Sequence, residues 1–360
     1  MERQALRRPR VRRSGKAFGA AVIGIALMTY VGQGFSPADS SSLRIFFIDV
    51  EGGSATLVVS PAGESLLIDS GFPGGRDAAR IARVAREEAR VERIDHYVTT
   101  HWHRDHVGGI ADLARLIPVA RYYGHSIPDP LPSDIQKSHV DAWRQLAGQP
   151  TWLRAGDRIE FTNSGAGPRL VVDVLAADGV VSGETPGSPQ VRACERGHAA
   201  KDEDVSDNAR SLGFRLSYGA FDVFAGGDLT WNVEHKLVCP RPVFAVPVDA
   251  WLVDHHGADS SNNPALLQAL QPTVAIVNSG PRKGAEPNTM RLLLDQLGTA
   301  RVFQLHRNLR DGAVNADPAR VANEGEECDA AFVRLTVPPD TKRYTVAIPA
   351  RDRSWSFDVR

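Results

Sequence analysis

The sequence predicts an α/β fold in which two β-sheets pack together and helices cover the outside, within one domain of about 300 residues. Two observations lead to this prediction. Strand-like segments cluster first and then alternate with helical segments, and that order occurs twice along the chain. The 360 residues are 42% hydrophobic and 24% charged, which suffices to bury a full core and excludes disorder and disulfide-dense miniproteins.

The first half of the chain supplies four predicted strands and two predicted helices. A Gly52-Gly53 turn separates the first two strands, and the fourth strand runs directly into His101. Residues 121–150 carry closely spaced prolines and are expected to form an irregular surface insertion or lid. The strands are expected at residues 43–49, 55–59, 65–69 and 94–100, and the helices at 77–90 and from Gly108-Gly109 through Ile117.

The second half alternates strands with helices and ends in a strand-rich tail. Residues 178–209 are polar and rich in Gly and Pro, which indicates a long exposed loop. The tail after residue 330 is too short for a separate module, so we expect it to complete the sandwich. Strands are expected at 170–175, 212–218, 222–225, 250–254, 274–278, 301–305, 332–337, 344–348 and 355–359, and helices at 264–270 and 287–297.

The first 38 residues have the organisation of a secretory signal peptide. A basic stretch precedes an apolar run at residues 17–31, and Ser36-Pro37-Ala38 offers small residues for cleavage after Ala38. The apolar run is shorter than the ~20 residues of a membrane-spanning helix, and an uncleaved signal anchor is the alternative interpretation. We therefore expect an exported protein, periplasmic or extracellular, that meets the membrane only if the signal is uncleaved.

The formal net charge of −1 divides unevenly along the chain. Seven basic residues against one acidic residue give residues 1–16 a charge of +6, and residues 17–38 carry none, so the remainder sums to −7. Binding to nucleic-acid phosphates needs Lys and Arg. We expect a small-molecule or phosphodiester substrate and no extended nucleic-acid surface.

Three cysteines, Cys194, Cys239 and Cys328, stand apart from any Cys-x-x-Cys pair. In the oxidising compartment that export implies, they allow one disulfide and leave one thiol over, and the sequence does not say which two pair. We expect these cysteines to be buried or loop residues that take no part in catalysis or metal binding.

Four of six consecutive residues, His101, His103, Asp105 and His106, are potential metal ligands. His101 and His103 are two apart on extended backbone, so they point the same way and can hold one ion. Asp105 and His106 lie past the bend and face a neighbouring position for a second ion. Mixed imidazole and carboxylate ligands suit Zn²⁺, with Mn²⁺ or Fe as alternatives.

With this motif and the features that accompany it, the sequence resembles the metallo-β-lactamase-fold hydrolase superfamily, from about residue 43 to at least residue 256. The resemblance implies a four-layer αββα sandwich that holds two divalent metal ions. It also implies that Asp69 orients a metal-ligating histidine. Asp228 in Gly227-Asp228 would bridge both metals, and the sequence His255-His256-Gly257 would supply the last histidine ligand.

One departure from the family pattern concerns the first metal. The superfamily usually has a further histidine shortly before the bridging aspartate, whereas this chain has Asn208 in the segment 207–211. Asn208 or His198 would then complete the first site. An Asn-x-x-Ser here, the later His-His-Gly and the opening Phe47-Ile48-Asp49-Val50 resemble the ComEC-like subgroup, although Glu51 and the residues after it depart from that subgroup's usual Gly-Gln-Gly-Asp.

The roles of the later histidines depend on local geometry. Adjacent residues on a strand face opposite sides, so only one of His255 and His256 is expected to reach the metal. We favour His255 as the ligand and His256 as a proton donor or a contact for a substrate oxygen. His306, which follows a predicted strand, is expected to be a surface histidine.

These features favour metal-assisted hydrolysis, in which a hydroxide that bridges the metals attacks carbon or phosphorus. Asp105 or Asp228 would accept the proton, and His256 or a basic residue would protonate the leaving group. The ComEC-like features favour a phosphodiester substrate. A lactone or carboxylic ester hydrolase is the alternative enzyme, and a non-catalytic metal- or ligand-binding module on the same fold is the alternative from a different class.

Overall fold

Two β-sheets lie face to face in the computed structural model, which describes residues 41–162, 167–183, 190–195 and 199–360. The first sheet has the order β18-β17-β16-β1-β2-β3-β4-β5-β6, antiparallel from β18 to β3 and parallel from β3 to β6. Its strands are β1 (Leu43–Phe47), β2 (Thr56–Val59), β3 (Ser65–Ile68), β4 (His96–Thr99), β5 (Tyr122–Gly124), β6 (Thr151–Trp152), β16 (Val333–Val337), β17 (Arg343–Ile348) and β18 (Arg353–Asp358).

The second sheet has the order β15-β14-β13-β12-β11-β10-β8-β7, and β9 pairs with β8. The pairs from β7 to β11 are antiparallel, and those from β11 to β15 are parallel. Its strands are β7 (Arg158–Glu160), β8 (Leu170–Ala177), β9 (Val180–Val181), β10 (Gly213–Tyr218), β11 (Phe221–Ala225), β12 (Ala250–Leu252), β13 (Val274–Val277), β14 (Val302–His306) and β15 (Val321–Asn323).

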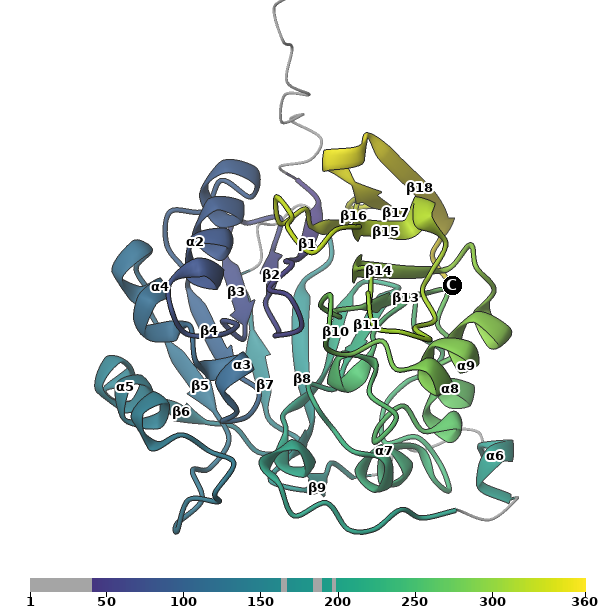
Figure 1. Ribbon diagram of the computed structural model, residues 1–360, viewed down its shortest axis with the longest axis horizontal. Helices are drawn as coiled ribbons and strands as arrows, with labels where there is room; N and C mark the ends of the chain where they lie inside the picture. The colour runs from purple at the N-terminus through teal and green to yellow at the C-terminus, as the bar shows by residue number, and fades with distance from the viewer. Residues whose placement is uncertain (1–40, 163–166, 184–189, 196–198) are drawn as a thin grey trace, which may run out of the picture. The chain divides into compact units, whose positions relative to one another are not determined.

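Helices cover the outer face of each sheet (Figure 1). On the first sheet lie α2 (Arg76–Arg83), continued by the π-helical turn η1 (Val84–Glu88), with α4 (Ile110–Leu116) and α5 (Lys137–Ala147). On the second lie α7 (Trp231–Val238), α8 (Pro264–Leu270) and α9 (Pro287–Leu297). The short elements are α3 (Arg104–Val107), α6 (Arg192–Glu195), η2 (Asp207–Arg210), η3 (Asp254–Gly257), η4 (Pro318–Arg320) and η5 (Pro349–Arg351).

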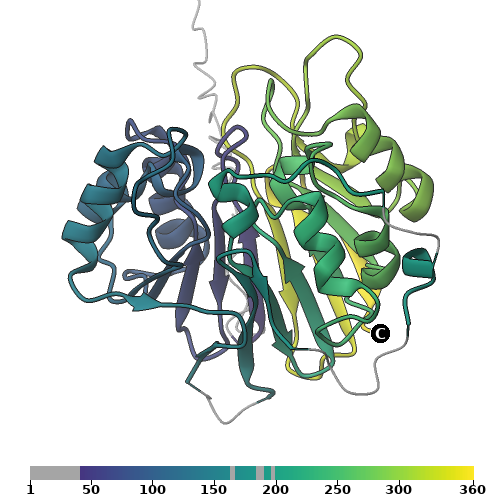
Figure 2. The same ribbon diagram turned by 90° about the horizontal axis from the view of Figure 1, so that it is seen from below.

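The buried apolar residues divide into three clusters, which correspond to the three interfaces between four layers. Successive side chains on a strand face opposite sides, so on β2 Val58 packs between the sheets while Leu57 packs beneath the helices. On the second sheet, Phe224 of β11 faces the helices in the same way. Figure 2 shows the layers in the order helix, sheet, sheet, helix. The predicted αββα sandwich is therefore confirmed.

The prediction for residues 121–150 was wrong. Instead of an irregular lid, this segment contains β5, which pairs in parallel with β4, and α5, whose Val140 and Trp143 are fully buried. The closely spaced prolines precede α5 rather than interrupting it, so the helix forms unhindered. Helix α7 and strands β6, β7 and β15 were missed as well, because each is short or carries little periodic signal.

The strand-rich tail completes the sandwich as expected. Strand β16 pairs with β1, so that Leu335 lies opposite Ile45, and β17 and β18 extend the sheet from there. All described residues belong to one compact unit. None of their helices is long and apolar enough to cross a membrane. The signal peptide expected at residues 1–38 lies outside the described residues.

Candidate metal centre

The parallel strands of both sheets end at the same edge, and the candidate ligands lie there. Asp69 follows β3, and His101 stands two residues after β4. Asp228 follows β11 in the second sheet, and His255 and His256 follow β12. The carboxyl ends of neighbouring parallel strands bring distant residues together, so side chains far apart in sequence meet in one buried cluster.

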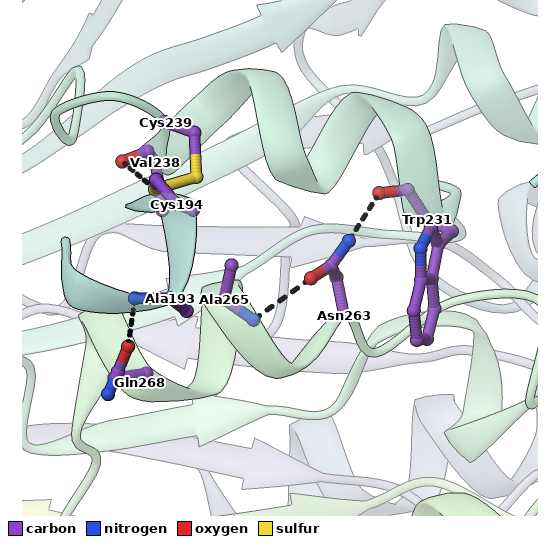
Figure 3. Close-up of a disulfide and its surroundings, with 8 residues drawn as sticks. All are labelled: Ala193, Cys194, Trp231, Val238, Cys239, Asn263, Ala265 and Gln268. Carbon is purple, nitrogen blue, oxygen red and sulfur yellow. Dashed lines mark hydrogen bonds between the residues drawn. A yellow bond between two sulfur atoms is a disulfide. The ribbon is translucent and has the colours of Figure 1, made fainter. Parts of the chain in front are cut away.

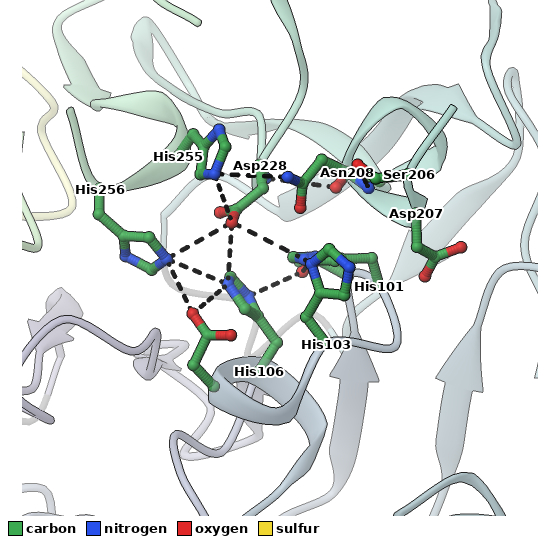
Figure 4. Close-up of polar contacts among 12 residues, drawn as sticks. His101, His103, His106, Ser206, Asp207, Asn208, Asp228, His255 and His256 are labelled. Atoms are coloured by element: carbon green, nitrogen blue, oxygen red, sulfur yellow. Dashed lines mark hydrogen bonds and ion pairs between the residues drawn. The ribbon is translucent and has the colours of Figure 1, made fainter. Parts of the chain in front are cut away.

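The short segment between β4 and α3 brings its ligand atoms close together. His101 is fully buried, and its Nε2 lies 3.0 Å from Nδ1 of His103. The other ring nitrogen of His103 lies 2.7 Å from a carboxylate oxygen of Asp134, which fixes the orientation of the ring. Asp105 and His106 belong to α3, where His106 faces Asp228 (Figure 4) and Asp105 contacts His256, both candidate ligands of the second sheet. The two pairs therefore lie side by side in one cluster.

Asp228 is the point on which the cluster converges (Figure 4). Its Oδ2 lies 3.7 Å from Nε2 of His101 and 3.3 Å from Nε2 of His106. The Nε2 atoms of His255 and His256 each lie 3.5 Å from the same oxygen. One carboxylate oxygen thus faces four imidazole nitrogens at once, which is the arrangement expected of a residue shared by two cation sites.

Four buried residues, Asp105, His106, Asp228 and His256, offer ligand atoms that lie within 4.8 Å of one another and could hold a metal ion. Nε2 of His256 lies 3.2 Å from both Oδ2 of Asp105 and Nε2 of His106. Two carboxylates and two imidazoles form a donor set suited to Zn²⁺ or to a harder ion such as Mn²⁺.

The extended strand geometry predicted for His255 and His256 was wrong. His255 has φ 50° and His256 has φ 55°, so both adopt the left-handed conformation rather than an extended one. Strand alternation therefore does not apply, and both rings face Asp228. Ser260 and Ser261 lie near Nδ1 of His255, at 3.2 and 3.1 Å, and leave its Nε2 turned toward the cluster.

Asn208 lies beside His255 on the first-metal side of the cluster. Its Nδ2 is 3.4 Å from Nε2 of His255, while its Oδ1 is buried and has no hydrogen-bond partner among the described residues. A buried oxygen without a partner is costly, and a cation would satisfy it. The residues present therefore fit a metal. His198, the alternative ligand, lies outside the described residues.

Asp69 holds one imidazole of the cluster in place. Its Oδ2 lies 2.7 Å from Nδ1 of His106, and its carboxylate also accepts hydrogen bonds from the backbone and side chain of Thr100. With the ring proton on Nδ1, the lone pair on Nε2 faces Asp228. This is the orienting position that the family resemblance implied for Asp69.

The buried groups shift each other's pKa values. Burial opposes ionisation of Asp228, but His106 and three further histidines outweigh it and hold the pKa of Asp228 well below its usual value. Burial also disfavours charge on His106, yet Asp228, Asp69 and Asp105 hold its pKa well above the usual value. Burial and the nearby His106 lower the pKa of His101. Ionised carboxylates that face buried imidazoles provide the electrostatic setting for a divalent cation.

The structure adds groups that no local motif indicates. Lys283, in the loop after β13, forms an ion pair with Asp105. Asp207 accepts a hydrogen bond from the backbone N–H of Trp102, between the two motif histidines, at 2.7 Å. His125 is buried between Asp207 and Asp178. In each of these contacts the two residues are separated by between 53 and 178 positions in the sequence. Motif spacing therefore gives no signal for them.

His306 is fully buried, so the prediction of a surface position was wrong. It closes β14, and its Nδ1 lies 2.9 Å from Oδ2 of the buried Asp49. Burial disfavours the charged ring, but the hydrogen bond to Asp49 outweighs it and raises the pKa of His306 to about 10. His306 does not take part in the cluster around Asp228.

The model of the metallo-beta-lactamase superfamily matches residues 48–185. Thioesterase pkgB of Emericella nidulans is 36% identical over 78 residues, 22% of this chain and 22% of that protein. Atrochrysone carboxyl ACP thioesterase dmxR1 of a Cryptosporiopsis species is 36% identical over 91 residues, 25% of this chain and 26% of that protein. The matched stretch spans about a quarter of the length of these relatives, or less.

Two solved structures are also similar to this chain. The metallo-beta-lactamase fold protein YhfI from Bacillus subtilis has a TM-score of 0.43 at 13% identity, covering 73% of this chain and 95% of that one. Zn²⁺-bound PqqB from Methylobacterium extorquens has a TM-score of 0.43 at 12% identity, covering 74% of this chain and 98% of that one.

Proposed function

We propose that this chain, whose residues 48–185 match the model of the metallo-beta-lactamase superfamily, is a hydrolase that binds two divalent cations at one buried centre and cleaves an ester or thioester bond. The observation that carries the proposal is the position of Asp228, whose Oδ2 faces the imidazoles of His101, His106, His255 and His256 at 3.3–3.7 Å. Zinc fits this donor set best, with manganese or iron as alternatives.

The donors divide into two sets that share Asp228. The first comprises His101 and His103, with His255 in the place of the histidine that the family usually has before the bridging aspartate, and Oδ1 of Asn208 as a weaker ligand. His255 supports this assignment because its Nε2 lies near both Asp228 and Asn208. The second set comprises Asp105, His106 and His256.

Cations bound by these residues would polarise the scissile carbonyl and lower the pKa of an attacking water. The carboxylates of Asp105 and Asp228 are placed to accept the proton of that water. Nζ of Lys283 is held at Asp105 and its side chain is partly exposed, so it can protonate the leaving group or pair with an anionic part of the substrate. Asp69 keeps the proton of His106 on Nδ1 throughout.

The preference for a carbonyl substrate comes from the relatives, since both fungal proteins are named as thioesterases. An ester or thioester is therefore the first candidate substrate, in place of the phosphodiester that the ComEC-like features of the sequence favoured. A phosphodiester is the second candidate, because the ammonium of Lys283 beside the candidate metal ligand Asp105 would also pair with a phosphate oxygen.

A substrate panel on the zinc-loaded protein tests the proposal. The panel contains a short S-acyl-N-acetylcysteamine thioester, p-nitrophenyl acetate, bis-p-nitrophenyl phosphate and nitrocefin. We expect turnover of the thioester and the ester, reduced at least ~100-fold in Asp228→Ala. The exposed Asp358, replaced by Asn, is the control variant and should retain activity. Turnover of the phosphodiester alone would favour the second candidate, and no turnover of any substrate would contradict the hydrolase proposal.

We also propose that the protein is exported. Cys194 and Cys239 form a disulfide that fastens α6 to the end of α7 (Figure 3), and such bonds persist in oxidising compartments. N-terminal sequencing of the protein from fractionated cells tests this proposal. Export predicts a chain that begins at Asp39 outside the cytoplasm, whereas an intact chain confined to the cytoplasm would contradict it.

A further inference from the structure

A second group of potential ligands lies outside the cluster around Asp228. It comprises Asp49, which follows β1, His306, which ends β14, and Cys328, which precedes β16. Oδ2 of Asp49 lies 2.9 Å from Nδ1 of His306 and 3.4 Å from Sγ of Cys328. Sγ lies 3.9 Å from Nδ1. Three segments that are distant in sequence thus converge on one point.

Glu51 adds a fourth donor to this group. Its Oε1 lies 3.8 Å from Sγ of Cys328 and 2.7 Å from the guanidinium of Arg80, which also reaches Sγ at 3.7 Å. The other carboxylate oxygen of Glu51 pairs with Arg76, so Glu51 lies at the rim of the group between two arginines. The group therefore offers one thiol, one imidazole and the carboxylate of Asp49, with Glu51 as a further donor at its rim.

The hydrogen bonds of His306 show that a proton or a metal ion lies between this ring and Asp49. Its Nε2 donates a hydrogen bond to the backbone carbonyl of Gly325 at 2.7 Å, so Nδ1 faces the carboxylate of Asp49. Two lone pairs at 2.9 Å repel each other, so either a proton or a metal ion must lie between them. A backbone carbonyl on the remote ring nitrogen is also the usual orienting partner of a metal-ligating histidine.

The distances between donors approach those of a tetrahedral zinc site. Zinc bonds of about 2.0–2.1 Å to nitrogen, 2.0–2.2 Å to oxygen and 2.3 Å to sulfur place pairs of ligand atoms about 3.3–3.6 Å apart. The separations among Asp49, His306 and Cys328 range from 2.9 to 3.9 Å, and Glu51 lies 3.8 Å from Cys328. Shifts of a few tenths of an ångström would place the donors of Asp49, His306 and Cys328 around one ion.

We propose that Asp49, Glu51, His306 and Cys328 form a structural site for one zinc-like divalent cation, separate from the candidate metal centre. Binding would displace the proton on Nδ1 of His306 and the thiol proton of Cys328. Two protons would leave as one dication enters, so the summed charge of the four side chains and the cation stays at −1. The exchange therefore places no additional net charge in the buried region.

The position of this site gives it a structural consequence. The loop that carries Asp49 and Glu51 continues to Ser54, whose backbone N–H donates to the carbonyl of Asp105 at 3.0 Å. Gly52 lies in this loop and packs closely against Lys283, because a Cβ at position 52 would lie 2.8 Å from Cβ of Lys283. A cation held by Asp49 and Glu51 would fasten this loop to β14 and to the segment before β16. It would thereby stabilise one wall of the candidate metal centre.

Cobalt titration of the metal-free full chain, with the Cys194–Cys239 disulfide intact, tests the proposal, because thiolate ligation to Co²⁺ produces a charge-transfer absorption in the near ultraviolet. The candidate metal centre contains no cysteine, and Cys194 and Cys239 are joined in a disulfide, so this band reports on Cys328 alone. We expect the band to saturate at one Co²⁺ per chain. A wild-type protein saturated with Co²⁺ that lacks the band would overturn the proposal without need of any variant.

Two variants locate the site. Cys328→Ser should abolish the band and lower bound metal by one ion per chain, with unchanged far-ultraviolet circular dichroism. Asp228→Ala, in the other cluster, should retain the band while losing hydrolytic activity. A band that persists in Cys328→Ser, or that disappears in Asp228→Ala, would overturn the assignment.

Discussion

Oδ2 of Asp69 lies 2.7 Å from Nδ1 of His106, and both side chains are buried at the foot of the candidate metal centre. Asp69 has φ 62°, so the chain accepts a left-handed residue to place this carboxylate. The backbone N–H and the hydroxyl of Thr100 also donate hydrogen bonds to the Asp69 carboxylate. The hydrogen bond between Asp69 and His106 determines which nitrogen of His106 faces Asp228. Asp69 therefore influences metal binding without being a metal ligand.

Asp69→Asn should therefore weaken zinc binding by about 10–100-fold, the usual effect of removing a partner that orients a ligand. The amide can present a donor to the imidazole and so favour the wrong tautomer of His106. Competition with a fluorescent zinc chelator measures the change. The exposed Asp358→Asn variant is the control, and equal zinc affinity in both variants would contradict the role assigned to Asp69.

His255→Gln should remove one of the two cations at the centre and leave the other. His255 is assigned to the set with His101 and His103, whereas His256 belongs to the set with Asp105 and His106. Metal content by mass spectrometry should fall by one ion per chain, and turnover should fall at least ~100-fold. His139→Gln, on α5, is the matched control with full metal content. Unchanged stoichiometry in His255→Gln would exclude His255 as a ligand.

The sequence predicts those parts of the site that depend only on residues close together in the chain. The spacing of His101, His103, Asp105 and His106 is enough to identify them as candidate ligands, without knowledge of the tertiary structure. The arrangement of His255 and His256 could not be predicted in this way, because their left-handed backbone depends on surrounding contacts. The carbonyl of His256 accepts from Ala285, which follows a different strand.

The same distinction applies to the fold. Long periodic strands and the αββα layering follow from apolar patterns, whereas burial of His306 depends on Asp49, 257 residues away. Helix α5 shows that a local signal can also be overlooked. Val140 and Trp143 have the three-residue spacing of one helical face, but the prolines before them favoured a loop.

Gly284→Ala should destabilise the protein more than Gly75→Ala, although both positions have φ between 74° and 82°. A Cβ at Gly75 meets no atom within 4 Å, so its cost is the left-handed backbone alone, about 1 kcal/mol. A Cβ at Gly284 would lie 2.3 Å from the carbonyl oxygen of His256, which adds about 1–3 kcal/mol of steric strain. Urea unfolding measures both free energies, and equal losses would contradict close packing beneath His256.

Asp178→Asn should reveal a stability contribution that depends on pH. Burial opposes its charge, but His125, Ser126 and Arg210 outweigh it and lower the pKa of Asp178 to about 2. A carboxyl whose pKa is depressed by folding contributes stability above its unfolded value near 4, and that contribution is lost as the pH falls toward 2.

Because Asp178 is partly exposed, we expect the variant to lose on the order of 1–2 kcal/mol of unfolding free energy at pH 7. Denaturant unfolding of both proteins between pH 2 and 7 measures the difference, which should shrink below pH 4. A difference that is constant across this range would show that charge on Asp178 contributes nothing.

Reduction of the Cys194–Cys239 disulfide should lower the free energy of unfolding by about 2–4 kcal/mol, since the bond closes a loop of 45 residues. The double variant Cys194→Ser with Cys239→Ser should lose the same amount without reductant. Thermal unfolding with and without dithiothreitol measures the effect, and Cys328→Ser measured without added metal is the control. No change in the melting temperature on reduction would contradict a stabilising role.

The dependence of thioester hydrolysis on zinc tests whether cations held around Asp228 are needed for hydrolysis. Metal-free protein is titrated with zinc while kcat/KM for the thioester is followed, in parallel with Asp228→Asn. We expect no turnover without zinc, a rise that saturates as the candidate metal centre fills, and at least ~100-fold lower activity in the variant at saturating zinc. Hydrolysis by the metal-free protein at the full rate, or full activity in Asp228→Asn, would contradict the proposal.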